Sequence, residues 1–126
     1  KKSFGQGNYS SMSIQYFGNL NQFKQLFWNI LRNALKAMPD GGTLTVDFEK
    51  NKKDEIQLRF ADTGIGMAED KKERIFEPFY SGFEDGLGLG MAIVRKIVDD
   101  YKGKIKVASE PDKGTEIIVI LPLGKA

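Results

Sequence analysis

Two kinds of hydrophobic period follow each other along this chain, and their order limits the folds that it can adopt. A period of 3.6 residues, typical of a helix with one buried face, runs through Phe23, Phe27, Ile30, Leu31, Ala34 and Met38. Strict alternation, typical of half-buried strands, follows in 44–48 and 56–60 and returns in 104–108 and 115–121. Between the two pairs of strands lies a second helical stripe, formed by Val94, Ile97, Val98 and Tyr101. Because each element has one apolar face, we expect helices packed on one face of a sheet.

Local signals predict where these elements begin and end. Asn21 is the expected N-cap of the first helix, and the segment 39–42, Pro-Asp-Gly-Gly, ends it. Turns at 51–54 and 110–114 join the strands in pairs, a further edge strand is expected at 12–17, and one helical turn is expected near 69–75. With 126 residues the chain forms one domain. We expect a ragged polar start over 1–11 and, over 12–126, a two-layer α/β (α+β) sandwich with five strands and two or three helices.

Charge and composition exclude several classes of function. Lys plus Arg is 19 and Asp plus Glu is 17, so the net charge of 19 − 17 = +2 gives the domain no electrostatic reason to bind nucleic acid or a membrane. The chain has no Cys and no His, which excludes disulfides, thiolate or imidazole metal sites, a Ser-His-Asp triad and phosphorylation on a histidine of its own. Its longest apolar run, 117–121, is far shorter than the ~20 residues of a membrane span. We expect a cytoplasmic domain that is part of a longer protein.

The first predicted helix carries a polar strip on the side away from its apolar stripe. At about 100° per residue, Asn33 and Lys36 fall within about 40° of Asn29. A solvated face is the ordinary interpretation of such a strip. Two Asn residues, however, lower helix propensity without forming a charge pair. Amide oxygens and an ammonium group on one strip also suit a polyphosphate with bound Mg²⁺.

Two glycine-rich segments follow in the middle of the chain. Asp62-Thr63-Gly64-Ile65-Gly66 comes directly after a strand; there Asp62 could accept a hydrogen bond from an exocyclic amine while Gly64 and Gly66 let the backbone approach a flat ring. A simple turn is the alternative. Gly86-Leu87-Gly88-Leu89-Gly90 opens the second long helix, without the preceding strand of a dinucleotide-binding motif or the following Lys-Ser/Thr of a P-loop. The unpaired N–H groups of a helix start still favour phosphate there.

Four segments, in order, resemble the motifs of one protein family. The segment 29–36, Asn-Ile-Leu-Arg-Asn-Ala-Leu-Lys, resembles the N box of sensor histidine kinases, 62–66 resembles their G1 box, 75–79 (Ile-Phe-Glu-Pro-Phe) their F box, and 86–94 their G2 box. Each motif is weak alone, but their order and spacing are specific and extend over nearly the whole chain from about Met12. The resemblance implies the catalytic, ATP-binding domain of a bacterial-type two-component sensor kinase, in the gyrase-like ATPase superfamily. It also implies a Bergerat-type fold, with a mixed five-stranded sheet and about three helices on one face.

The same resemblance implies a role for individual residues. Asp62 would bind the adenine amino group beside Gly64 and Gly66, and Thr115 would lie near it. Asn33 would coordinate Mg²⁺, while Asn29 and Lys36 would lie at the phosphates of ATP as the catalytic residues. Further contacts to the nucleotide are implied for Phe76, Gly86, Leu87, Gly88, Leu89 and Gly90, although Phe76 equally suits the core. The implied partners are a His-bearing dimerisation domain of the parent protein and, through that protein, the receiver domain of a response regulator.

The chain departs from the family pattern at its lid. Only six residues, Tyr80–Asp85, separate Phe79 from Gly86, and none of them is Lys or Arg. A degenerate nucleotide-binding module that regulates its neighbour without phosphotransfer is therefore the main alternative to a protein-histidine kinase. A related ATP hydrolase is disfavoured, because Asn29 stands where those relatives carry the Glu that activates water. A serine-directed anti-sigma kinase is a further alternative.

Overall fold

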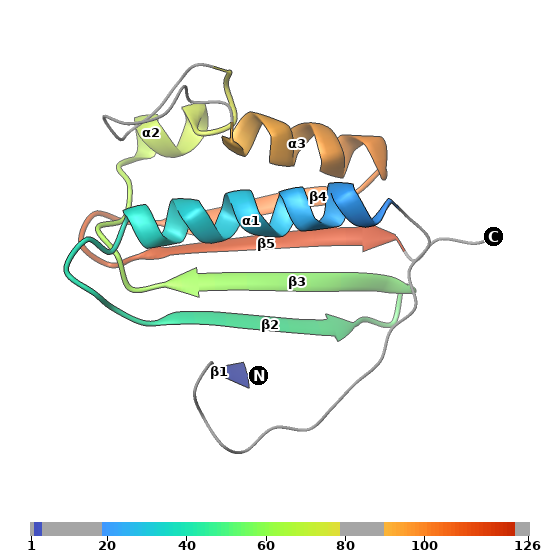
Figure 1. Ribbon diagram of the computed structural model, residues 1–126, viewed down its shortest axis with the longest axis horizontal. Helices are drawn as coiled ribbons and strands as arrows, with labels where there is room; N and C mark the ends of the chain where they lie inside the picture. Colours follow the sequence, from blue (N-terminus) through green and yellow to red (C-terminus); the bar gives the residue numbers. More distant parts are fainter. Residues whose placement is uncertain (1, 4–18, 79–89, 123–126) are drawn as a thin grey trace.

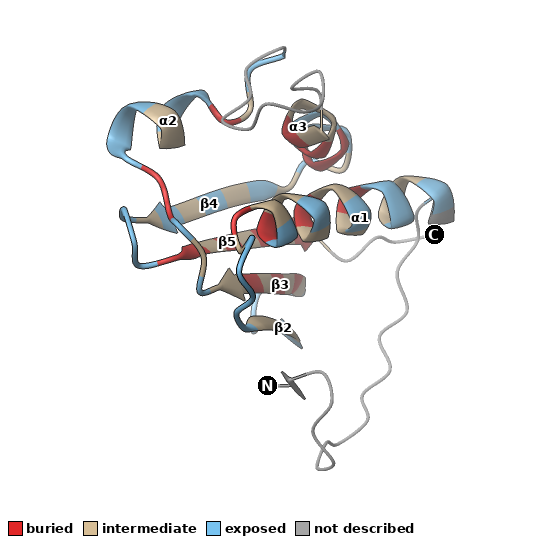
Figure 2. Cartoon of the chain, turned by 60° about the vertical axis from the view of Figure 1, so that its left-hand side comes forward, coloured by how far each residue is buried: buried red, intermediate tan, exposed pale blue. Residues whose placement is uncertain are grey.

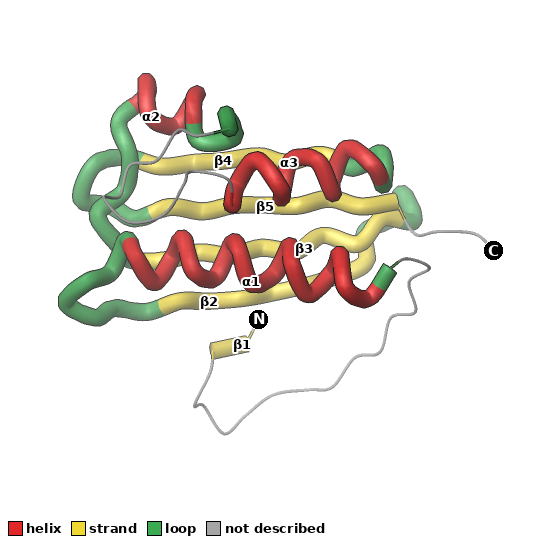
Figure 3. The backbone as a smooth tube through the Cα atoms, turned by 45° about the horizontal axis from the view of Figure 1, so that its top comes forward, coloured by secondary structure: helices red, strands yellow, loops and turns green. Residues whose placement is uncertain are grey.

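The helices of this domain lie together on one face of its sheet. The computed structural model describes residues 2–3, 19–78 and 90–122. Figures 1 and 3 show α1 and α3 side by side above the strands, so the expected α+β arrangement with three helices is confirmed. The described elements are β1 (Lys2–Ser3), α1 (Leu20–Lys36), β2 (Leu44–Lys50), β3 (Glu55–Asp62), α2 (Glu69–Arg74), α3 (Gly90–Asp100), β4 (Lys104–Ser109) and β5 (Thr115–Pro122).

The described strands form an antiparallel sheet in the order β1-β2-β3-β5-β4. The expectation of a mixed sheet is therefore wrong for these strands. The crossover through α2 and α3 makes β3 and β4 parallel to each other, but β5 returns between them and pairs antiparallel with both. The edge strand expected at 12–17 lies outside the described residues. The strand described beside β2 is the short β1, in which Lys2 pairs with Val46 and Ser3 with Thr45.

The core fills the space between the helices and the sheet, as Figure 2 shows by colour. Alternate residues of β3 and β5 are buried beneath α1 and α3, as their periods predict. The period assigned to the first helix needs two corrections. It omits Leu26, which is completely buried, and it includes Met38, which lies beyond the end of α1 and whose Sδ accepts a hydrogen bond from Thr63 Oγ1 at 3.7 Å.

The first helix begins two residues earlier than expected. Asn19, not Asn21, is its N-cap, because Asn19 Oδ1 accepts hydrogen bonds from the backbone N–H groups of Asn21 at 2.8 Å and of Gln22 at 3.3 Å. The backbone N–H of Asn19 donates in turn to the Tyr101 hydroxyl at 2.6 Å, and that hydroxyl donates to Gln22 Oε1 at 2.8 Å. The start of α1 is thus fixed to the end of α3. No helix in the described part of the chain is both long and apolar enough to cross a membrane.

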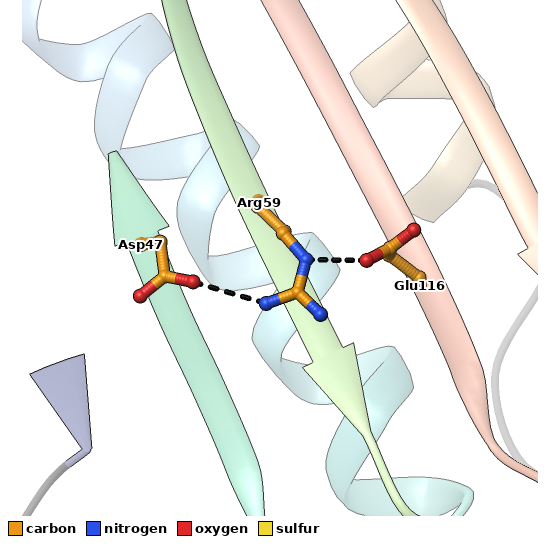
Figure 4. Close-up of polar contacts among 3 residues, drawn as sticks. All are labelled: Asp47, Arg59 and Glu116. Carbon is orange, nitrogen blue, oxygen red and sulfur yellow. Dashed lines mark hydrogen bonds and ion pairs between the residues drawn. The ribbon is translucent and has the colours of Figure 1, made fainter. Parts of the chain in front are cut away.

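An ion-pair ladder crosses the face of the sheet opposite the helices (Figure 4). Arg59 in β3 bonds through Nη1 to Asp47 Oδ2 in β2, at 3.0 Å, and through Nε to Glu116 Oε2 in β5. The bond to Glu116, more than the one to Asp47, raises the pKa of Arg59 above its ordinary value against the opposing effect of burial. The ladder ties three neighbouring strands together in one register. In that register Asp62 lies opposite Thr115, at the end of the sheet where the candidate site is found.

Candidate functional site

The helix-covered face of the sheet changes from apolar to polar at its last row. Two rows across β3, β5 and β4 are apolar: Leu58, Val119 and Ile105, then Phe60, Ile117 and Val107. The next row in the same register is Asp62, Thr115 and Ser109. Because side chains alternate between the two faces of a strand, all three rows belong to the same face. The sequence therefore places a polar floor at the edge of an apolar core.

Asp62 is the one acidic residue of this row, and half of its hydrogen-bonding capacity is used. Its Oδ1 accepts from the backbone N–H of Gly64 at 2.8 Å and from that of Thr115 at 3.2 Å. Within the described ranges its Oδ2 has no hydrogen-bond partner. Burial raises the pKa of Asp62 above its ordinary value, and the two backbone hydrogen bonds oppose that rise. A half-buried carboxylate with one unpaired oxygen is suited to accept a hydrogen bond from a ligand amine.

The glycines after Asp62 bring the loop against the protein's own backbone. A Cβ on Gly64 would lie 2.4 Å from the carbonyl oxygen of Ala37, and the next residue, Ile65, donates its N–H to that same oxygen at 2.9 Å. Gly66 has a φ of +67°, and a Cβ there would lie 1.9 Å from the carbonyl oxygen of Glu110. The loop is thus held between the end of α1 and the β4–β5 turn. Its glycines have a packing reason that the sequence alone did not reveal.

The predicted polar strip of α1 faces the start of α3 at one position. Asn29 Oδ1 lies 3.5 Å from the position of a Cβ on Gly90, the first residue of α3. The Nδ2 of Asn29 is buried and has no hydrogen-bond partner in the described part of the chain. An unpaired buried amide costs about 1–3 kcal/mol, which argues against a simple solvated face. Asn33 and Lys36 are half-buried on the same strip, Lys36 in the last turn of the helix.

The remaining predicted nucleotide contacts divide between described and undescribed residues. Phe76 packs against the core, and the guanidinium carbon of Arg95 lies 6.0 Å from its ring centroid. Gly90 opens α3. The other members of the glycine-rich segment, Gly86, Leu87, Gly88 and Leu89, lie outside the described residues together with the lid.

The described residues offer few ligands for a metal ion. In residues 2–3, 19–78 and 90–122 no group of three or more His, Cys, Asp or Glu side chains could hold a metal ion. Mg²⁺ is commonly held by one or two protein oxygens together with phosphate oxygens and water. The half-buried amide of Asn33, through its oxygen, fits that way of binding.

Sequence reasoning missed one member of the polar row, Ser109. Its Oγ donates to the carbonyl oxygen of Gly114 at 3.0 Å and lies 2.8 Å from Thr115 Oγ1. A cavity of about 310 Å³ at this end of the sheet touches Asp62, Ser109 and Thr115, but its lining also includes Arg59 and Glu116 of the opposite face, so it does not by itself outline the polar row. The signal was present in the sequence, because the alternation of Ile105 and Val107 puts Ser109 on the buried face of its strand. A second cavity, of about 470 Å³, lies on the flank of α1 and touches none of the predicted site residues.

The sequence matches a known family over most of its length. Residues 18–125 match the family described as histidine kinase-, DNA gyrase B-, and HSP90-like ATPase. Sporulation kinase E of Bacillus subtilis (strain 168) is 46% identical over 103 residues, which cover 82% of this chain and 14% of the relative. The C4-dicarboxylate transport sensor protein DctB of Rhizobium meliloti (strain 1021) is 44% identical over 110 residues, which cover 86% of this chain and 17% of the relative. The chain thus spans less than a fifth of the length of these two relatives.

Solved structures agree in fold. The mycobacterial sensor histidine kinase MprB superposes with a TM-score of 0.76 at 29% identity, covering 88% of this chain and 76% of that chain. Full-length ShkA, solved in complex with AMPPNP, superposes with a TM-score of 0.74 at 31% identity, covering 83% of this chain and 22% of that chain.

Proposed function

Because the chain belongs to the family of histidine kinase-, DNA gyrase B- and HSP90-like ATPases, as the catalytic ATP-binding domain of a two-component sensor histidine kinase, we propose that its parent protein transfers the γ-phosphate of Mg-ATP to a histidine on a separate dimerisation domain. The acceptor must lie elsewhere, since this chain has no His. Phosphoryl transfer depends mainly on positioning and on electrostatic stabilisation, so the domain has to hold ATP and present its γ-phosphate.

One observation carries the proposal: within residues 2–3, 19–78 and 90–122, two polar groups of the site have no hydrogen-bond partner. They are Asp62 Oδ2, at the end of β3, and the buried Asn29 Nδ2, on α1 beside the start of α3. Protein structures seldom leave a buried group such as Asn29 Nδ2 unsatisfied, and a ligand is one of the ordinary reasons. We assign the adenine amino group to Asp62 and the phosphates to Asn29.

The other site residues follow from the same orientation of the nucleotide. Gly64 and Gly66 hold the loop that carries Asp62, and Thr115 lies at the adenine end. Asn33 would ligate Mg²⁺, which supplies charge neutralisation at the phosphates when bound, and Lys36 would lie near those phosphates. The segment 86–90 would line the phosphate path at the start of α3. This orientation puts the γ-phosphate at the helix side of the domain, accessible to a partner.

Asn29 also bears on the type of reaction. An amide cannot take a proton from water, so the residue that serves as base in the hydrolysing relatives is absent here. Transfer to a protein acceptor is therefore favoured over hydrolysis. The parent protein would pass the phosphoryl group on to the receiver domain of a response regulator, and we place the domain in the cytoplasm, where ATP is available.

The test is phosphotransfer with the two domains supplied separately. Labelled ATP is incubated with this chain alone, with the His-bearing domain of its parent protein alone, and with both. We expect acid-labile label on the His-bearing domain only when both are present, and none when Asp62→Ala replaces the wild-type chain. Acid-stable label would indicate a serine kinase. Binding of ATP without any label on the partner would indicate a regulatory module, the alternative that the lid without Lys or Arg supports.

A further inference from the structure

The polar row contains a chain of hydroxyl groups whose direction can be worked out. Ser109 Oγ lies 3.0 Å from the carbonyl oxygen of Gly114 and 2.8 Å from Thr115 Oγ1. A carbonyl oxygen only accepts, so Ser109 must donate its single proton to Gly114. The hydrogen bond between the two hydroxyls must then run the other way, with Thr115 as the donor and Ser109 as the acceptor.

This direction determines what Thr115 can offer to a ligand. Its only hydroxyl proton is used on Ser109, so Thr115 Oγ1 has lone pairs left and no proton to donate. The residue beside it in the row, Asp62, is also an acceptor, through Oδ2, to which no described residue donates. Thr115 itself is 6% exposed, so rotation of its hydroxyl away from Ser109 would break a buried hydrogen bond. The floor of the site is therefore held in a state that accepts hydrogen bonds at two neighbouring positions.

We propose that Ser109 is a specificity-determining positioning residue, which fixes the Thr115 hydroxyl as an acceptor and so selects a base with an exocyclic amine over one with an oxo group at the same place. The inference rests on the proposed nucleotide site. The 6-amino group of adenine carries two N–H donors, which match the two acceptors, directly or through a water molecule. The 6-oxo group of hypoxanthine or guanine would meet two acceptors and no donor. Some analogues cannot form the hydrogen bond for which a site is built. The site discriminates against them more strongly than a difference in shape alone would.

The test compares ATP with inosine triphosphate, which differs from it by the 6-amino to 6-oxo change and the N1 proton that follows from it. Affinities of both for this chain are measured by calorimetry in the presence of Mg²⁺. We expect the wild-type chain to prefer ATP by about tenfold or more, the size of one lost hydrogen bond to a charged group. In Ser109→Ala the proton of Thr115 is released to turn toward the ligand, and the preference should fall by about three- to tenfold. Ser109→Thr keeps a hydroxyl at the same position and should restore the preference.

Two further variants separate a specificity role from a structural one. Val107→Ala changes the same face of β4 two residues away, and it should lower the unfolding temperature without changing the ratio of the two affinities. Thr115→Val removes the hydroxyl and keeps the shape of the side chain. This variant should by itself lower the ratio of ATP affinity to inosine triphosphate affinity, and adding Ser109→Ala to it should lower the ratio no further. If the Ser109→Ala chain folds poorly, Thr115→Val alone still tests the inference, because an unchanged ratio in that variant would show that the Thr115 hydroxyl does not select the base.

The outcomes distinguish this inference from the proposed function. An unchanged ratio in Ser109→Ala, or equal affinity of the wild-type chain for the two nucleotides, would overturn the role of Ser109 while leaving ATP binding in place. A wild-type chain that binds neither nucleotide would overturn the proposed nucleotide site itself.

Discussion

Replacing Asp62 by Asn should make the nucleotide-free chain more stable and bind ATP more weakly. The two backbone hydrogen bonds to Asp62 Oδ1, from Gly64 at 2.8 Å and Thr115 at 3.2 Å, can be accepted equally by the amide oxygen of Asn. Only the unpaired Oδ2 is lost, and an NH₂ group takes its place. The change removes a charge whose burial raises the pKa of Asp62, and it keeps every contact that holds the loop.

The expected sizes of the two effects follow from this geometry. Relief of a destabilised functional group commonly contributes about 0.5–2 kcal/mol of stability, which is a rise of roughly 2–8 °C in the unfolding temperature of a domain of this length. The loss of a charged acceptor, replaced by a donor that faces the adenine amine, should cost about 1.5–3 kcal/mol of binding, or roughly ten- to a hundredfold in affinity. Calorimetric unfolding without nucleotide and ATP titration on the same preparations measure both.

The pH dependence gives an independent check of the cause. The pKa of Asp62 in the folded chain lies above its ordinary value of 3.8, so folding disfavours the charged carboxylate. This cost to the free energy of unfolding is complete at pH values above the pKa of the folded state. As the pH falls through the folded pKa, wild-type Asp62 becomes protonated and the penalty disappears. The stability advantage of Asp62→Asn should therefore be constant near neutral pH, shrink in acid, and vanish below 3.8.

Asp40→Asn is the matched control, because it makes the same chemical change at an exposed position in the loop after α1. It should alter neither stability nor ATP affinity. The reasoning is refuted if Asp62→Asn is no more stable than the wild-type chain at pH 7 without nucleotide, or if it binds ATP as tightly as the wild-type chain does.

Three further predictions address the loop, the sheet and the metal. Gly64→Ala should destabilise the chain by about 2 kcal/mol or more, since its Cβ would meet the carbonyl oxygen of Ala37 at 2.4 Å. Gly90→Ala should fold normally, since its Cβ meets no atom of a described residue closer than 3.5 Å, and thermal unfolding of the pair checks this. Arg59→Ala should lower the free energy of unfolding by about 1–2 kcal/mol in denaturant titrations, since it leaves two half-buried carboxylates without their shared cation. ATP affinity should change little, and a large loss of affinity would contradict a purely structural role of the ion-pair ladder. Asn33→Asp should keep more Mg²⁺-dependent ATP binding than Asn33→Ala in calorimetry, and equal Mg²⁺ dependence in both would show that Asn33 does not bind the metal.

The elements of the fold could be predicted from the sequence, but their arrangement could not. Each long helix and strand buries one face, and the spacing of its apolar residues records that face. The position of β5 between β3 and β4 has no local record, because it depends on pairing between segments far apart in the chain. The N-cap was predicted at Asn21 and lies at Asn19, since both residues suit the position and the contact with Tyr101 decides between them.

For the candidate site, too, the sequence supplied single residues and not their arrangement. Asp62 and Asn29 could be selected because they interrupt otherwise apolar or helix-favouring patterns. Ser109 could not be connected with Thr115 until the pairing of β4 with β5 was known, since a serine at the end of a strand is ordinary in sequence. A residue that acts through a neighbour in another strand is visible only in the register.

The glycines after Asp62 have a physical cause in the fold that differs from the one expected from the sequence. The sequence suggested that they let a flat ring approach the backbone, and the structure shows that they let other parts of the chain approach it. The carbonyl oxygens of Ala37 and Glu110 lie where side chains on Gly64 and Gly66 would be, and that of Asp62 lies 2.1 Å from the Cβ position of Gly114. Each close approach fixes the backbone that carries or supports the carboxylate, so the position of Asp62 is set before any ligand arrives. A site organised in this way loses little further conformational entropy on binding, and more of its interaction energy remains available for affinity.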